Sequence, residues 1–239
     1  MKVDVLGVKV DNITMVEAVE GILSAAGGTL PFSVFTPNSE MIMEARKAPS
    51  FMSVLNSASL VVPDGSGVIL GARFMGKRIK EKVAGVELVQ NILSSGMELS
   101  LFIYGGKPGV AGKAAENIRS LYRNITVCGT EHGYLDERDK NALPEKIRLS
   151  SPDIVLVGLG VPAQENWIHE NSGKIGGAVF IGCGGTIDIL SGEARRAPSV
   201  FIRLHLEWLY RLLKEPSRIG RMMRIPVFLF LCLKKRFSR

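Results

Sequence analysis

Asp64 is a residue whose type and position could support general base catalysis. It stands in the stretch VVPDGSG, directly after an apolar run. A carboxylate in such a turn can accept the proton of a hydroxyl group as that group attacks a substrate. Aspartate is also a good helix N-cap, and a helix beginning near Gly65 would explain Asp64 without a catalytic role. The local sequence by itself slightly favours the cap.

Polar side chains follow three other apolar runs in the same way. Thr36 and Asn38 stand in FTPNSEM, where they could hydrogen-bond a sugar or a base, or cap the next helix. Gln164 stands in GVPAQE, in the first turn of a predicted helix, and its alternative is a side chain that faces solvent. Asp188 in GGTIDIL is a second carboxylate with the same ambiguity as Asp64.

The turns that carry these residues are rich in glycine. They read TPNSE, PDGSG, YGGKPG, GLGVPAQE and GCGGTID. Glycine lets backbone amides approach a ligand closely, and the N-termini of the helices that follow favour anions, above all phosphates. Glycine is common in such turns anyway, so one turn says little. The whole set predicts a phosphate-containing substrate.

Several common chemistries do not fit the sequence. Residues 158–163 match the G-x-G-x-x-A dinucleotide fingerprint, but no acidic residue ends the next predicted strand at Gly182. The sequence has no Walker A loop and no D-x-D pair, and its three histidines and three cysteines lack the spacing of metal ligands. We therefore expect neither a cofactor nor a metal. Scattered, odd-numbered cysteines also indicate a reducing compartment.

The elements that must position these turns alternate between short apolar strands and helices. This alternation predicts an α/β fold, with a largely parallel, Rossmann-like sheet covered by helices on both faces. A short hairpin or a bent strand is expected at residues 3–10. The expected strands span residues 32–36, 59–65, 99–106, 125–129, 153–160 and 177–182. The expected helices span residues 12–26, 38–47, 87–96, 109–122, 140–150 and 162–173.

The positive charge of the chain is concentrated at its C-terminus. Residues 195–239 hold 12 Lys or Arg and 2 Asp or Glu, whereas residues 1–194 hold 18 and 21. Beside this charge lies the apolar run 225–233, which is far shorter than the roughly 20 residues of a spanning helix. We therefore expect a catalytic core, 1–194, and a basic amphipathic helical appendage, 195–239, that associates with a membrane surface. Nucleic acid is not an expected partner.

The appendage also carries a helical pattern. Apolar residues recur at helical spacing, and Pro216 and Pro226 are expected to interrupt the helices. Core packing is the common explanation of such a stripe, which consists of Phe201, Leu204, Trp208 and Leu212. The arginines beside it could instead fold over the strand ends and bind a diphosphate, because guanidinium groups match phosphate geometry.

Six segments together resemble the WecG/TagA/CpsF glycosyltransferase family, in order and over nearly the whole chain. They are GVKVDNITMVEAVE, FTPNSEMIMEAR, VVPDGSGV, VGLGVPAQENWI, GCGGTIDILSGEARRAP and LEWLYRLLKEPSR. The resemblance implies transfer of N-acetylmannosamine from its UDP derivative, with inversion, to the 4-hydroxyl of GlcNAc on undecaprenyl diphosphate. That reaction belongs to wall teichoic acid linkage-unit synthesis. It implies a peripheral enzyme on the cytoplasmic face of the cell membrane, and homo-oligomerisation stays open.

The resemblance also implies roles for individual residues. Asp64 matches the proposed catalytic base of the family. The family has an Arg at the position of Lys82, and lysine keeps the charge but loses the bidentate fork. The positions that match substrate-binding residues of the family are Thr36, Asn38, Lys82, Gln164, Arg211 and Arg218.

Two other functions fit the same sequence. The first keeps the acceptor but uses another UDP-sugar donor, such as N-acetylmannosaminuronic acid or a hexose, for another cell-surface polysaccharide. The second is a non-catalytic scaffold that binds membranes and retains the fold. Turnover with a set of UDP-sugars distinguishes these alternatives.

Overall fold

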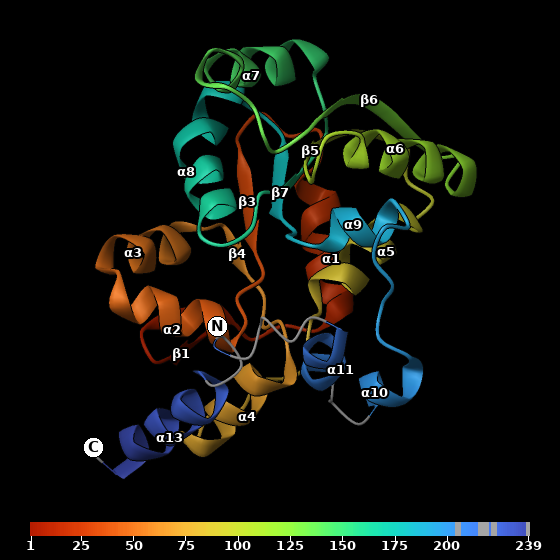
Figure 1. Cartoon of the computed structure of the whole chain (residues 1–239). Coiled ribbons are helices and arrows are strands. Elements are labelled where there is room, and N and C mark those ends of the chain that lie inside the picture. The colour runs from red at the N-terminus through yellow and green to blue at the C-terminus, as the bar shows by residue number, and fades with distance from the viewer. Residues whose placement is uncertain (204–206, 215–219, 221–223, 238–239) are drawn as a thin grey trace.

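A six-stranded parallel sheet forms the centre of the computed structural model, which describes residues 1–203, 207–214, 220 and 224–237 (Figure 1). The strand order is β4-β3-β8-β7-β5-β6, and each pairing is parallel. This confirms the predicted Rossmann-like sheet. The strands are β3 (Phe32–Phe35), β4 (Leu60–Val61), β5 (Leu99–Gly105), β6 (Ile125–Glu131), β7 (Ile154–Gly158) and β8 (Val179–Gly182).

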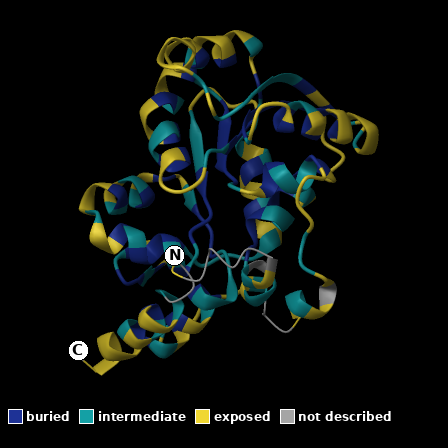
Figure 2. Ribbon diagram, viewed as in Figure 1, coloured by how far each residue is buried: buried dark blue, intermediate teal, exposed yellow. Residues whose placement is uncertain are grey.

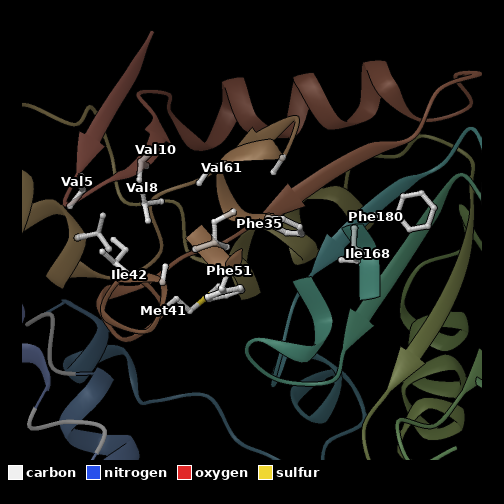
Figure 3. Packing of buried hydrophobic residues seen from close by; sticks show 14 of the residues in the cluster. Val5, Val8, Val10, Phe35, Met41, Ile42, Phe51, Val61, Ile168 and Phe180 are labelled. Atoms are coloured by element: carbon white, nitrogen blue, oxygen red, sulfur yellow. The ribbon is translucent and has the colours of Figure 1, made fainter. Parts of the chain in front are cut away.

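The N-terminal hairpin is present as expected. Strands β1 (Lys2–Val5) and β2 (Val8–Asp11) pair antiparallel, with Val5 opposite Val8. The turn residues Leu6 and Gly7 both have positive φ, 52° and 102°, as a two-residue hairpin loop requires. The hairpin valines pack beside Ile42 in the core (Figure 3).

Helices cover both faces of the sheet because neighbouring strand residues point to opposite sides. Phe35 packs in the cluster of one face and Val34 in the cluster of the other. Exposed residues lie on the outer sides of the helices (Figure 2). One face carries α2 (Ser39–Lys47), α3 (Pro49–Ser57), α7 (Glu137–Ser150) and α8 (Ala163–Ile175). The other carries α1 (Met15–Ala25), α5 (Gly85–Leu93), α6 (Val110–Leu121) and α9 (Thr186–Leu190).

Helices α3 and α9 were not among the expected helices. A further helix, α4 (Ser66–Phe74), lies where the alternative interpretation of Asp64 placed a helix beginning near Gly65. Helix α3 begins at Pro49, which suits the first helical turn because its missing N–H has no helical partner there. Helix α4 is short and contains Gly67 and Gly71, so its composition resembles a loop.

The C-terminal segment contains α10 (Ser199–Arg203), α11 (Glu207–Lys214) and α13 (Arg224–Phe237). The prediction that Pro226 interrupts a helix is wrong. Pro226 lies in the first turn of α13, where the missing N–H leaves the helix intact. Leu204 and Pro216 lie outside the described residues. No helix among the described residues is long and apolar enough to cross a membrane.

Helix α13 packs against α4 and α2 (Figure 1). Phe228 and Cys232 are fully buried and belong to the same core cluster as Ile42. A Cβ on Gly71 would lie 2.5 Å from Cε1 of Phe228, so only glycine leaves room for the ring. The apolar run at the C-terminus therefore has one face in the core of the protein.

Candidate active site

The strand order brings four of the predicted turns to one edge of the sheet. The carboxyl ends of β4, β3, β8 and β7 are neighbours, and these ends lead into Asp64, Thr36 with Asn38, Gly184 and Gln164. The backbone N–H of Asp64 donates to the carbonyl of Pro37 over 3.2 Å, which joins the turns after β4 and β3. Ligands of parallel α/β sheets bind at such an edge.

Asp64 is half-buried at this edge. The N-cap of α4 is Gly65, whose φ of 85° favours glycine, so Asp64 precedes the cap instead of occupying it. The segment that carries Lys82 lies alongside, because the N–H of Val83 donates to the carbonyl of Pro63 over 2.9 Å. The predicted base and the predicted cation therefore belong to adjacent segments.

Thr36 and Asn38 both make bonds within the protein. The hydroxyl of Thr36, which is 7% exposed, donates to the carbonyl of Gly182 over 3.2 Å and thereby links the ends of β3 and β8. Asn38 is the N-cap of α2, and its Oδ1 accepts from the N–H of Met41 over 3.0 Å. The capping interpretation of Asn38 is therefore confirmed.

Gln164 points inward and not to solvent. It is 3% exposed, and its Oε1 accepts from the N–H of Gly184 over 3.0 Å. Its Nε2 donates to Oε1 of Glu165 over 2.7 Å. The amide therefore ties the N-terminus of α8 to the glycine turn after β8.

Glu165 is a buried acid that the sequence analysis did not single out. The residue is fully buried, and its Oε2 has no hydrogen-bond partner among the described residues. Burial raises the pKa of this carboxyl from 4.5 to about 7, against the smaller lowering by the hydrogen bond from Gln164. Helical spacing was the available signal, because Glu165, Ile168 and Ile175 share the buried face of α8.

Ion pairs hold the C-terminal segment close to the edge. Nζ of Lys82 lies 3.1 Å from Oε2 of Glu207 in α11, and both side chains are largely shielded from solvent. Arg196 pairs with Glu87 in the first turn of α5. The charge of Lys82 is therefore already balanced by a residue of the appendage.

The two predicted tail arginines cannot be placed in the site. Arg211 belongs to α11, but its side chain is not described, and Arg218 lies outside the described residues. Asp188, the second carboxylate, lies in the first turn of α9 beyond β8. Among the described residues, no group of three or more His, Cys, Asp and Glu side chains could hold a metal ion.

This arrangement offers a carboxylate, an inward amide and the backbone N–H groups of a glycine turn at one sheet edge. A model described as the glycosyl transferase WecG/TagA/CpsF family matches residues 3–239.

Two similar proteins are each named N-acetylglucosaminyldiphosphoundecaprenol N-acetyl-beta-D-mannosaminyltransferase. The one from Bacillus spizizenii (strain ATCC 23059 / NRRL B-14472 / W23) is 37% identical over 203 residues, 84% of this chain and 78% of that protein. The one from Staphylococcus aureus (strain MW2) is 33% identical over 233 residues, 96% of this chain and 91% of that protein.

Proposed function

Because the chain belongs to the WecG/TagA/CpsF family of glycosyl transferases, we propose that it transfers N-acetylmannosamine from UDP to the 4-hydroxyl of GlcNAc on undecaprenyl diphosphate. The reaction would be a step in the synthesis of the linkage unit of wall teichoic acid. The observation that carries the proposal is the meeting of Asp64, Thr36, Asn38 and Gln164 at adjacent strand ends. The names of the two similar proteins support the donor sugar and the acceptor.

In this mechanism Asp64 is the general base. A sugar hydroxyl is a weak nucleophile, and a carboxylate that accepts its proton during attack lowers the barrier. The hydroxyl oxygen forms the new bond to the anomeric carbon while the bond to the UDP oxygen breaks on the opposite side. This single displacement inverts the anomeric centre and needs no nucleophile from the protein.

The leaving UDP gains negative charge on its diphosphate. We propose that backbone N–H groups of the glycine turns and cations of the appendage stabilise that charge. Arg211 and Arg218 are the proposed guanidinium donors. Lys82 can join them if its pairing with Glu207 is exchanged for the diphosphate.

The lipid of the acceptor requires the reaction to occur at a bilayer. We therefore propose that residues 1–194 form the catalytic core and that residues 195–239 dock on the cytoplasmic face of the membrane. Apolar side chains on α13 that remain exposed, such as Phe230 at 65% and Phe237 at 77%, support this role.

Sugar transfer to a lipid-diphosphate-GlcNAc analogue tests the proposal. Purified protein is incubated with UDP-linked N-acetylmannosamine, N-acetylmannosaminuronic acid or a hexose, and the product is followed by mass spectrometry. We expect transfer of N-acetylmannosamine. Transfer of only one of the other sugars would refute the donor, and no transfer of any would favour the scaffold function.

The role of Asp64 has its own variants. Asp64→Asn should reduce turnover about 100-fold or more, because an amide of the same shape cannot accept the proton. Asp188→Asn, in the first turn of α9 beyond β8, is the matched control and should retain most activity. If the losses of the two variants were reversed, Asp188 would be the base.

A further inference from the structure

A cleft that the proposed chemistry does not use lies between α13 and the N-terminal hairpin. Its volume is about 490 Å³, and it opens to solvent. The residues that line it come from the hairpin turn, the last turn of α2, helix α3 and helix α13; they are Leu6, Arg46, Met52, Leu231, Lys234 and Lys235. Three side chains are apolar and three are cationic. We call it the hairpin cleft.

Among the described residues, no acid neutralises two of the three cations that line the hairpin cleft. Among the described residues no carboxylate forms an ion pair with Arg46 or Lys235. Glu44, the nearest acid along α2, is paired with Arg224 at a distance of 2.6 Å. A ligand that fits must therefore be anionic at one end and apolar beside it.

Helix α13 presents an apolar surface next to the cleft. Residues three, four or seven apart share a helix face, so Leu231, Lys234 and Lys235 point together into the hairpin cleft. Val227, Phe230 and Phe237 recur at the same kind of spacing on the adjoining face, where they are 48%, 65% and 77% exposed. The cleft therefore opens along the flank of the surface proposed to enter the bilayer.

We propose that the hairpin cleft binds the phosphate head group of an anionic phospholipid. Arg46 and Lys235 contact the phosphate, and Leu6 and Met52 pack against the glycerol and the first acyl carbons. Basic side chains near a bilayer attract anionic lipids, and guanidinium groups match phosphate geometry.

This lipid site is separate from the substrate site. Helix α2 begins after Asn38 at the sheet edge and reaches Arg46 eight residues later, which is about 12 Å along its axis. A head group held there, with α13 in the interface, would fix the orientation of the sheet edge toward the membrane. The inference rests on the proposed membrane location.

Methyl NMR of the full chain tests direct binding. Methionine methyl groups are labelled, and Met52 is assigned from its missing signal in Met52→Leu. We expect water-soluble short-chain phosphatidylglycerol to shift the Met52 signal saturably. Short-chain phosphatidylcholine and inorganic phosphate should not reproduce that shift. An equal shift with inorganic phosphate would show a simple anion site, and an unmoved Met52 signal would overturn the proposal.

Vesicle flotation supplies a second measurement. Arg46→Ala should weaken binding to vesicles that contain phosphatidylglycerol about 5-fold, since one basic side chain near an anionic surface contributes about a factor of that size. Arg123→Ala removes an exposed charge on another part of the surface and is the matched control. Equal losses for both variants would show general electrostatic attraction and no specific cleft.

Activity separates this inference from the proposed function. Arg46→Ala should retain sugar transfer to a water-soluble acceptor, because Arg46 lies outside the catalytic edge. If the unmodified chain has no transfer activity but Met52 still shifts, the catalytic proposal fails and the lipid site stands. If transfer is normal and Met52 does not respond, the lipid site alone is refuted.

Discussion

Replacing Glu165 with glutamine should change how the stability of the protein depends on pH. The carboxyl is fully buried, and burial raises its pKa to about 7 from an ordinary value of 4.5. Below about pH 4.5 the group is protonated in both the folded and the unfolded chain, and titration has no effect. Between pH 4.5 and 7 the unfolded chain loses the proton while the folded chain keeps it, so rising pH favours unfolding.

The size of this loss of stability follows from the shift in the pKa of Glu165. A difference of about 2.5 pKa units, each about 1.4 kcal/mol, removes about 3 kcal/mol of unfolding free energy by pH 7, and the loss then levels off. Glutamine has the shape of the protonated acid and does not titrate, and its amide oxygen can still accept from Gln164. Glu165→Gln should therefore remove this pH-dependent loss.

Urea unfolding followed by tryptophan fluorescence measures the difference. The free energy of unfolding is compared for the original chain and Glu165→Gln at about pH 5 and about pH 8. We expect the variant to gain about 2.5 kcal/mol relative to the original chain over this interval, because part of the loss has already occurred at pH 5. Glu145→Gln is the control. Glu145 is exposed and its pKa is lowered by the hydrogen bond from Arg148, so this variant should show a small change of opposite sign. If the free energy of unfolding of Glu165→Gln and of the original chain changed equally with pH, the burial argument would be refuted.

Three further substitutions test contacts around the site. Phe228→Ala should lower the free energy of unfolding by about 3–5 kcal/mol if α13 stays packed on the core. If α13 detaches instead, the loss should be smaller and α13 should become sensitive to proteases. Urea unfolding together with limited proteolysis distinguishes the two outcomes. Gly71→Leu should free α13 in the same way, because its Cβ would lie 2.5 Å from the Phe228 ring; unchanged protease resistance would contradict this. Thr36→Val should destabilise the protein by about 1–3 kcal/mol by leaving the carbonyl of Gly182 without its donor, and a loss of turnover with normal stability would instead show a role in substrate binding.

The elements of the fold could be predicted from sequence wherever the local signal was strong. Helix α1 lies within the expected range 12–26, and Thr14 and Glu17 form a capping box that sets its start three residues later than expected. Uninterrupted apolar runs, such as the one that became β7, marked the buried strands. Helix α4 was expected only as an alternative explanation of Asp64, because its glycines weaken the helical pattern. These glycines make room for neighbours that are distant in sequence, namely Ser39 and Phe228.

The candidate site was predictable in its residue types and not in its contacts. Four predicted residues meet at one edge because β3 lies between β4 and β8, and no local pattern determines that order. The burial of Glu165 and its bond to Gln164 depend on how α8 packs on the sheet. The pairing of Lys82 with Glu207 joins residues 125 positions apart, which only the folded chain can reveal.

The packing of Phe228 against Gly71 has a consequence for how the enzyme would reach the proposed lipid-linked acceptor. If the C-terminal segment became helical only on contact with the membrane, the entropy lost on ordering would reduce its binding free energy. Helix α13 is already folded and packed on α4, so its exposed aromatic side chains have a fixed orientation relative to the rest of the protein. Adhesion to the bilayer and alignment of the sheet edge would then occur as one rigid-body event.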